Sequence, residues 1–274
     1  PPLLGDSPYL SKSAFAMNED LISMDILYKD GLLKQEWYEE FCRRVVQAST
    51  WEEKWQCKKE ALWKLSHDKD LVIDWEPYES FQEENAYWLD DYALFCALDE
   101  FFLHRPWTEW PKDIGHHEAA AITRYRKELS ASVDHVKFMQ YLVHGQWQDL
   151  HDYAKKNDVS IMGDIPMFVA HNSADCWAHQ ELFILDEEGN PTSVAGVPPD
   201  YFSADGQRWG NPLYDYDAMK KDDYRWWVQR FKYTLTLIDE VRIDHFRGFE
   251  SYWKIPATAE TAREGTWVKA PGEE

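Results

Sequence analysis

The sequence has few cysteines, few basic residues and no long apolar run. Its four cysteines, Cys42, Cys57, Cys96 and Cys176, are scattered over 274 residues without a CxxC pair. Reduced structural thiols fit this spacing better than a disulfide scaffold or a zinc site. No apolar stretch approaches the roughly 20 residues needed to cross a bilayer, and the opening PPLLGDSPYL lacks the basic leader and apolar stretch of a signal peptide. We therefore expect a cytoplasmic protein with no membrane partner.

Acidic residues outnumber lysine and arginine by 50 to 29, which gives a formal net charge of −21. A surface this acidic repels phosphate groups, so we expect no nucleic acid partner. A neutral substrate is compatible with this charge. The hydrophobic fraction of 44% is typical of a globular chain that buries a core. The sequence predicts no particular oligomeric state.

Aromatic residues are abundant, with 15 Trp, 15 Tyr and 13 Phe. Many must lie in the core, because these side chains carry a large apolar area. Sugar-binding clefts also need flat aromatic faces, since a pyranose ring presents a C–H face that packs on them. Composition alone does not separate these two interpretations, so the positions of the aromatics have to decide.

The chain changes character along its length. Residues 1–30 contain Pro, Gly and Ser and look loop-like, whereas residues 32–66, 81–102 and 118–157 have the apolar spacing of helices. Residues 159–170 and 240–246 are short and apolar, as buried strands are, and a helical pattern precedes each of them. This order predicts an α/β fold with a parallel sheet, either a (β/α)8 barrel or a doubly wound sheet. Both fold types place their ligands where the strands end.

Two carboxylates fall in these strand candidates. With the period of two that a strand imposes, Arg242, Asp244 and Phe246 share one face, so Arg242 could keep Asp244 ionised as a nucleophile needs. The alternative is an ordinary ion pair at the end of a strand. Asp164 lies in an otherwise apolar run, where a buried acid needs a partner. It could grip substrate hydroxyls, or it could be satisfied by the backbone or by an arginine.

A long segment, residues 172–217, is dense in Gly, Pro, Asp and aromatic residues. Within it, the six Gly and Pro residues of 195–212 predict that no regular helix or strand forms there. Its aromatics are therefore not explained by the amphipathicity of a helix or a strand. They either fold inward as an anchor or form a lip over an extended ligand. Functional residues concentrate on such loops.

The motifs GDSPY (5–9), SAFAMN (13–18), WLDDYALFCAL (88–98), QWQDLHDYA (146–154), GDIPMFVA (163–170), NSADCWAHQELF (172–183), AGVPPDYFSADGQRWGNPLYDY (195–216) and VRIDHFRGFESYW (241–253) run through nearly the whole chain. Together they resemble the 4-α-glucanotransferases, the amylomaltases and plant-type disproportionating enzymes of glycoside hydrolase family 77. The resemblance implies transfer of α-1,4-glucan segments between maltodextrins, with no cofactor and no metal. It also implies part of a (β/α)8 TIM barrel with a large, mostly helical insertion subdomain. A plant source would place the protein in a plastid.

The resemblance implies roles for individual residues. Asp244 matches the catalytic nucleophile that forms the covalent glycosyl-enzyme, and Arg242 matches the arginine that keeps it charged. His245 and Asp164 match residues that contact the sugar at the cleavage point, and Tyr9 resembles the tyrosine that stacks on that sugar.

A further group of residues matches the flexible active-site loop that covers the glucan in this family. These residues are Asp200, Tyr201, Phe202, Gln207 and Trp209. By covering the site, such a loop favours a sugar acceptor over water.

The expected domain organisation follows from these matches. Residues 1–30 form an active-site loop region of the barrel, residues 31–155 a mainly helical subdomain, and residues 156–274 barrel strands and helices with the aromatic loop 172–217. The general acid Glu and second Asp of the family lie downstream of RIDHFRG, and the chain stops before either motif, so we expect a fragment that lacks the C-terminal part of the barrel. The alternatives are a truncated, inactive glucan-binding module and an α-amylase-like hydrolase.

Overall fold

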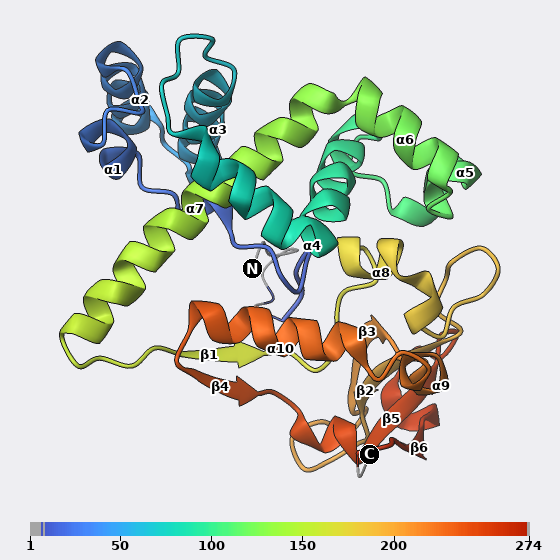
Figure 1. The fold of residues 1–274 in the computed structure, drawn as a ribbon. Coiled ribbons are helices and arrows are strands. Elements are labelled where there is room, and N and C mark those ends of the chain that lie inside the picture. Colours follow the sequence, from blue (N-terminus) through green and yellow to red (C-terminus); the bar gives the residue numbers. More distant parts are fainter. Residues whose placement is uncertain (1–6, 8, 273–274) are drawn as a thin grey trace.

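A computed structural model describes residue 7 and residues 9–272 of the chain (Figure 1). Residues 1–6 and 8, which belong to the expected loop region, lie outside the described part. Up to residue 156 the described elements are all helical, including two short helices within the region expected to be loop. The elements are η1 (Glu19–Leu21), α1 (Met24–Lys29), α2 (Gln35–Gln47), α3 (Trp51–Ser66), α4 (Trp75–Phe101), η2 (Trp107–Glu109), α5 (Lys112–Gly115), α6 (Ala119–Glu128) and α7 (Ser130–Lys156).

The helical pattern over residues 32–66 forms two helices, because Thr50 caps the second one. The Thr50 hydroxyl accepts a hydrogen bond from Glu53 N at 3.2 Å, and the Glu53 carboxylate accepts one from Thr50 N at 3.3 Å. This capping box satisfies N–H groups that a helix start leaves free. Helix α4 begins earlier than the expected residue 81, since Asp74 caps it and Pro77 falls in its first turn, where proline is tolerated.

One core joins the helical part to the rest of the molecule. The long helices α4 and α7 pack against each other, and α7 runs from the top to the lower left of Figure 1. Trp88 of α4 belongs to the same cluster of buried side chains as Ile165, Trp177 and Trp226 from the second half of the chain. The helical part is therefore packed onto the strands rather than tethered to them.

The second half contains a two-stranded parallel sheet. Strands β1 (Met162–Ile165) and β4 (Glu240–Ile243) pair so that Asp164 lies opposite Arg242. Helix α10 (Arg225–Leu237) precedes β4 and lies alongside the pair in Figure 1. A helix feeding a parallel strand is the arrangement of a βα unit.

Both strands are shorter than the expected 159–170 and 240–246. Pro166 follows β1 and has no N–H to continue the ladder. At His245 the backbone enters the left-handed region with φ +51°, and the 3-10 helix η4 (Phe246–Phe249) follows. Phe246 therefore does not share a strand face with Arg242, and that expectation was wrong. Asp164 is exposed rather than buried, because each strand has only one neighbour among the described residues.

The expectation that residues 195–212 hold no regular element was also wrong. Strand β2 (Ser193–Val197) pairs antiparallel with β3 (Gln207–Pro212) and with β5 (Ser251–Pro256), which pairs with β6 (Thr266–Lys269). The remaining short elements are α8 (Ala174–Ala178), η3 (Gln180–Leu182), α9 (Tyr216–Lys220) and η5 (Ala262–Glu264).

Two glycines make the β2–β3 hairpin possible. A Cβ added to Gly196 would lie 2.1 Å from the carbonyl oxygen of Gln207, so a larger residue would push the strands apart. Gly206 has φ +68°, which glycine adopts without the steric cost that a side chain brings. The glycines that suggested a broken chain instead permit the close strand approach and the turn.

In the described part of the chain, no helix combines the length and apolar character that crossing a bilayer requires.

Candidate active site

A cavity of about 270 Å³ lies at the ends of β1 and β4. It brings together five predicted site residues, Tyr9, Gln207, Trp209, Asp244 and His245. These residues come from the N-terminal segment, from β3 and from the turn after β4. The other described residues that line it are Ser7, Leu10, Pro166, Met167, Phe168 and Asn211.

Asp244 is the first residue after β4. Its backbone N–H donates to the carbonyl of Ile165 at 2.9 Å, so its position is still tied to the neighbouring strand. Among the described residues that line the cavity, Asp244 supplies the one carboxylate. A carboxylate at the carboxyl end of a parallel strand has the position at which α/β barrels carry out their chemistry.

His245 turns the chain into the cavity. Its left-handed backbone directs the ring toward Trp209, with ring centroids 4.9 Å apart and an edge-on angle of 89°. Burial lowers the pKa of His245, although the charge of Asp244 opposes this shift, so the imidazole is neutral near pH 7. Its Nε2 is buried and has no hydrogen-bond partner among the described residues. A buried polar atom without a partner is costly, and a ligand hydroxyl could satisfy it.

Arg242 pairs with the carboxylate of the neighbouring strand. Its Nε donates to Asp164 Oδ1 at 2.7 Å and its Nη2 donates to Asp164 Oδ2. This bond to Asp164 is the main cause of a raised pKa of Arg242, and Asp244 contributes less. Asp244 was the expected partner of Arg242, whereas Asp164 obtains the arginine partner that was one of its expected alternatives. Asp164 itself lines an adjoining cavity that shares Tyr9, Pro166 and Phe168 with the first one.

Trp209 forms one wall of the cavity. Its indole Nε1 donates to the side-chain oxygen of Gln207 at 3.0 Å, and its ring lies 6.4 Å from that of Phe168. The hairpin β2–β3 thus presents Trp209 and Gln207 from a regular strand, a firmer support than the irregular loop expected from the sequence.

Three predicted lip residues do not line the cavity. Tyr201 and Phe202 are almost fully exposed, at 106% and 97%. Asp200 shapes their turn, because its carboxylate accepts hydrogen bonds from the N–H groups of Phe202 and Ser203, each at 2.8 Å. Two bare aromatic rings therefore stand on a turn beyond β2, and their predicted role in covering a ligand remains a prediction.

Sequence reasoning missed Phe168 and Asn211. Both line the cavity, and both lie within motifs that carry the family resemblance, GDIPMFVA and GQRWGNP. Phe168 looks like an ordinary core residue in an apolar strand, and a single amide carries no pattern that separates it from a turn residue.

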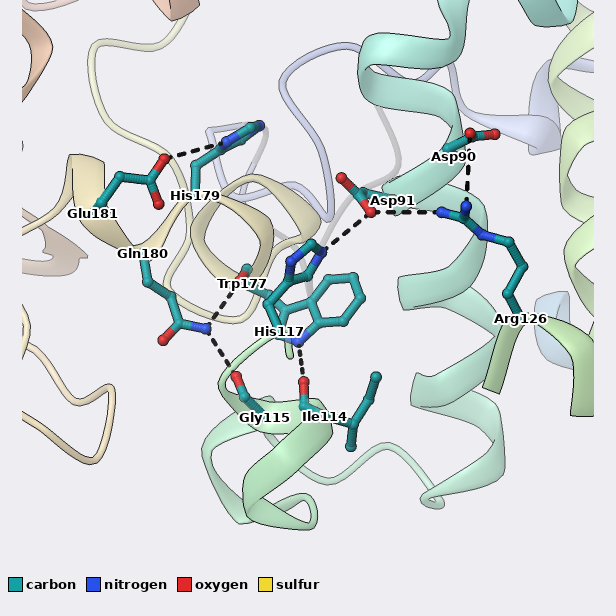
Figure 2. Close-up of polar contacts among 10 residues, drawn as sticks. All are labelled: Asp90, Asp91, Ile114, Gly115, His117, Arg126, Trp177, His179, Gln180 and Glu181. Atoms are coloured by element: carbon teal, nitrogen blue, oxygen red, sulfur yellow. Dashed lines mark hydrogen bonds and ion pairs between the residues drawn. The ribbon is translucent and has the colours of Figure 1, made fainter. Parts of the chain in front are cut away.

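The start of the aromatic loop is anchored to the helical part (Figure 2). Trp177 is fully buried, and its Nε1 donates to the carbonyl of Ile114 at 2.8 Å. Gln180 donates to the carbonyl of Gly115, and His117 lies against Trp177 while bonding Asp91 at 3.2 Å. Some loop aromatics are therefore inward anchors, whereas Trp209 lines the cavity.

The described residues contain no group of three or more His, Cys, Asp or Glu side chains that could hold a metal ion. The four cysteines are free thiols, and Cys57 and Cys176 are buried.

Comparisons with known proteins agree with this geometry. Residues 1–274 match the family model described as 4-alpha-glucanotransferase. A 4-alpha-glucanotransferase of Thermus thermophilus is 46% identical over 269 residues, which cover 98% of this chain and 54% of the relative. The chloroplastic/amyloplastic 4-alpha-glucanotransferase DPE1 of Arabidopsis thaliana is 38% identical, with 99% of this chain and 48% of the relative covered.

Among solved structures, amylomaltase from Streptococcus agalactiae in complex with acarbose superposes with a TM-score of 0.90 at 34% identity. The match covers 100% of this chain and 56% of that one. This likeness confirms the expected α/β fold class, part of a (β/α)8 barrel with a large, mostly helical insertion. The chain spans about half the length of the curated relatives it matches. It belongs to the 4-alpha-glucanotransferase family.

Proposed function

We propose that the protein moves α-1,4-glucan segments between maltodextrins as a 4-α-glucanotransferase, by a retaining double displacement. The observation that carries this proposal is one cavity in which Asp244 lies at the end of β4 beside His245 and Trp209. The family membership supports the same reaction. Since the chain spans about half of its relatives, the proposal concerns the whole protein to which these residues belong.

In the first step the Asp244 carboxylate attacks the anomeric carbon, and the glycosidic C–O bond breaks. A carboxylic acid about 5–5.5 Å away gives its proton to the leaving oxygen in such mechanisms. In the second step a sugar hydroxyl attacks the covalent glycosyl-enzyme and returns its proton to that base, which releases Asp244. The acid has to come from outside the described cavity lining, where Asp244 is the one carboxylate.

The other residues bind and shield the sugar in this proposal. Arg242 orients the Asp164 carboxylate through its two hydrogen bonds, and the oxygens of Asp164 can also accept hydrogen bonds from sugar hydroxyls. Neutral His245 satisfies its buried Nε2 on a hydroxyl, and Tyr9 stacks on the sugar at the cleavage point.

Trp209 and Gln207 form the wall over the glucan, and Asp200, Tyr201 and Phe202 form the outer lip. Water kept out of the covered site cannot compete with the acceptor sugar.

The test is the conversion of maltotriose by the whole protein and by its Asp244→Asn variant. Transfer yields longer oligomers plus glucose without net loss of linkages, whereas an α-amylase-like hydrolase loses linkages. We expect Asp244→Asn to abolish product formation and to keep maltoheptaose binding. Full activity in this variant would refute the nucleophile assignment.

A second candidate is a glucan-binding module without turnover. The single carboxylate among the described cavity-lining residues favours it for the 274-residue chain alone. Titration calorimetry with maltoheptaose, run beside the activity assay, separates the two functions. Binding without product formation supports the module, and product formation excludes it.

We also propose the domain roles expected from the sequence. Residues 31–155 would act as a helical insertion, and residues 1–30 and 156–274 would form the site, with the loop 172–217 over it. We also propose a cytoplasmic location, or a plastid if the source is a plant, and the chloroplastic/amyloplastic name of the Arabidopsis relative supports the plastid alternative. Cell fractionation tests this location.

A further inference from the structure

The segment that follows β1 is held by side chains instead of by a neighbouring strand. Buried backbone carbonyls need hydrogen-bond partners, and residues 166–171 leave the parallel ladder after Ile165. Five side chains donate to them, and all but Ser173 come from distant parts of the sequence. The bonds are Arg230 to Pro166 O at 2.7 Å, Tyr214 to Met167 O at 2.9 Å, Asn211 to Val169 O at 2.8 Å, Ser173 to Ala170 O at 2.6 Å and Trp107 to His171 O at 2.7 Å.

Asn211 differs from the other four donors, because it alone also lines the cavity that contains Asp244. It lies on β3, two residues after Trp209, and is 6% exposed. Its bond to Val169 therefore connects the strand that carries Trp209 with the segment that carries Phe168, which are two walls of the same cavity.

The orientation of the Asn211 amide follows from its partner. A backbone carbonyl can only accept, so the atom that faces Val169 O must be the donor Nδ2. The other amide atom, Oδ1, is then directed away from Val169. The described hydrogen bonds of Asn211 involve Nδ2 only, and Oδ1 is not among the fully buried side-chain atoms without a partner, so it stays accessible although the residue is only 6% exposed. Sugar hydroxyls are hydrogen-bond donors that such an accessible acceptor can take up.

We propose that Asn211 is a substrate-binding and positioning residue. Its Nδ2 fixes Trp209 relative to Phe168, and its Oδ1 accepts a hydrogen bond from a hydroxyl of the bound glucan. This inference rests on the proposed function, because it takes an α-1,4-glucan as the ligand of the cavity.

The experiment measures maltoheptaose affinity by calorimetry for wild type, Asn211→Asp and Asn211→Ala at pH 5.5 and pH 8. Ionised aspartate places an acceptor against Val169 O, whereas the protonated acid restores both a donor and an acceptor. Burial raises the pKa of such a carboxyl, so the introduced aspartate gains its proton at a higher pH than an exposed one does. Both pH values of the experiment lie above the isoelectric point of about 4.8. We expect the Asn211→Asp Kd to rise at least tenfold at pH 8 and to lie within threefold of wild type at pH 5.5. Asn211→Ala should bind weakly at both pH values.

Asn85→Asp is the matched control for general loss of stability. Asn85 is 8% exposed, and its Nδ2 donates to the carbonyl of Phe81 at 2.9 Å within α4, away from the cavity. We expect this variant to melt at a lower temperature at pH 8 and to keep its maltoheptaose Kd within threefold of wild type.

Three results would overturn the inference. Asn211→Asp with wild-type affinity at pH 8, or Asn211→Ala with wild-type affinity at both pH values, removes the binding role. If Asn211→Asp and Asn85→Asp lose the same amount of maltoheptaose affinity at pH 8, Asn211 has a structural role only. If wild type itself binds no maltoheptaose, the proposed function fails together with this inference, whereas the other results leave the proposed function intact.

Discussion

Arg242 reaches across the parallel sheet to Asp164, the residue opposite it, and donates to both oxygens of that carboxylate. Asp244, two residues further along, also raises the pKa of Arg242, although less than Asp164 does. Both bonds of the guanidinium fork therefore go to Asp164. Loss of the fork should disturb the position of this carboxylate.

Arg242→Lys is expected to raise the Kd for maltoheptaose at least tenfold, because an ammonium group does not donate two parallel bonds to Asp164. The melting temperature should stay at the wild-type value, since the Arg242 side chain is 60% exposed. Arg263→Lys is the control, because Arg263 pairs with Asp205 at 2.8 Å and is equally exposed. Calorimetry and thermal melts of both variants check this, and equal losses of affinity would contradict it.

Trp209→Ala is expected to weaken maltoheptaose binding about tenfold, because the indole lines the cavity and its stacking contact is lost.

Phe202→Ala should leave the melting temperature unchanged, because the ring is 97% exposed. If the outer lip closes over glucan, Phe202→Ala also raises the Kd. An unchanged Kd would remove Phe202 from the binding residues.

His135 should make stability depend on pH. Burial, reinforced by the charges of His67 and Lys59, lowers its pKa to about 4, whereas histidine in an unfolded chain titrates near 6.5. The unfolded state therefore binds more protons between these values, so the free energy of unfolding falls as the pH drops below about 7. The penalty is absent above pH 7 and reaches about 2 kcal/mol at pH 5.

Replacing this histidine should reduce that pH dependence. Urea denaturation of His135→Gln is expected to show a loss of stability between pH 7 and pH 5 that is about 1–2 kcal/mol smaller than in wild type. His116, which is exposed, provides the control variant His116→Gln. The same reduction in both variants would mean that burial of His135 is not the cause.

Two glycine-to-alanine variants should change stability in opposite directions. At Gly196 a methyl group would meet Gln207 O at 2.1 Å, so we expect a loss of about 2 kcal/mol or more and weaker glucan binding as β3 moves. At Gly145, inside α7, a methyl group meets nothing within 4 Å, so Gly145→Ala should stabilise by about 0.5–1 kcal/mol. Thermal and urea melts test both variants, and a neutral Gly196→Ala would contradict the close strand approach.

The sequence predicted the elements that depend on local pattern. The helices α6, α7 and α10 and the parallel order of β1 and β4 follow from apolar spacing and from helix-to-strand order. The lengths of β1 and β4 were not predicted correctly. Pro166 and the left-handed backbone of His245 end the two strands inside apolar stretches that look continuous in the sequence. The β2–β3 hairpin was missed because a glycine such as Gly196 usually interrupts a strand. Here it allows β3 to approach closely, which becomes visible only in the structure.

The candidate site was predictable only where its residues lie within a sequence motif. The family motifs led to Asp244, His245 and Trp209, which the structure brings into one cavity. The Arg242–Asp164 pair joins strands far apart in the chain, so period-two reasoning within one strand gave Arg242 the wrong principal partner. Asn211 carries no local pattern at all, and its importance follows only from the carbonyl it bonds.

The Asp164–Arg242 pairing also sets the moment during synthesis at which the cavity end of the parallel sheet can assemble. The two residues are 78 positions apart, so a ribosome adding about 5–20 residues per second completes Arg242 roughly 4–16 seconds after Asp164. During that interval the nascent chain has the first strand and its acid without the cation that neutralises it. Clearance of the later strand from the exit tunnel, rather than collapse of the helices made earlier, is therefore the event that completes this pair.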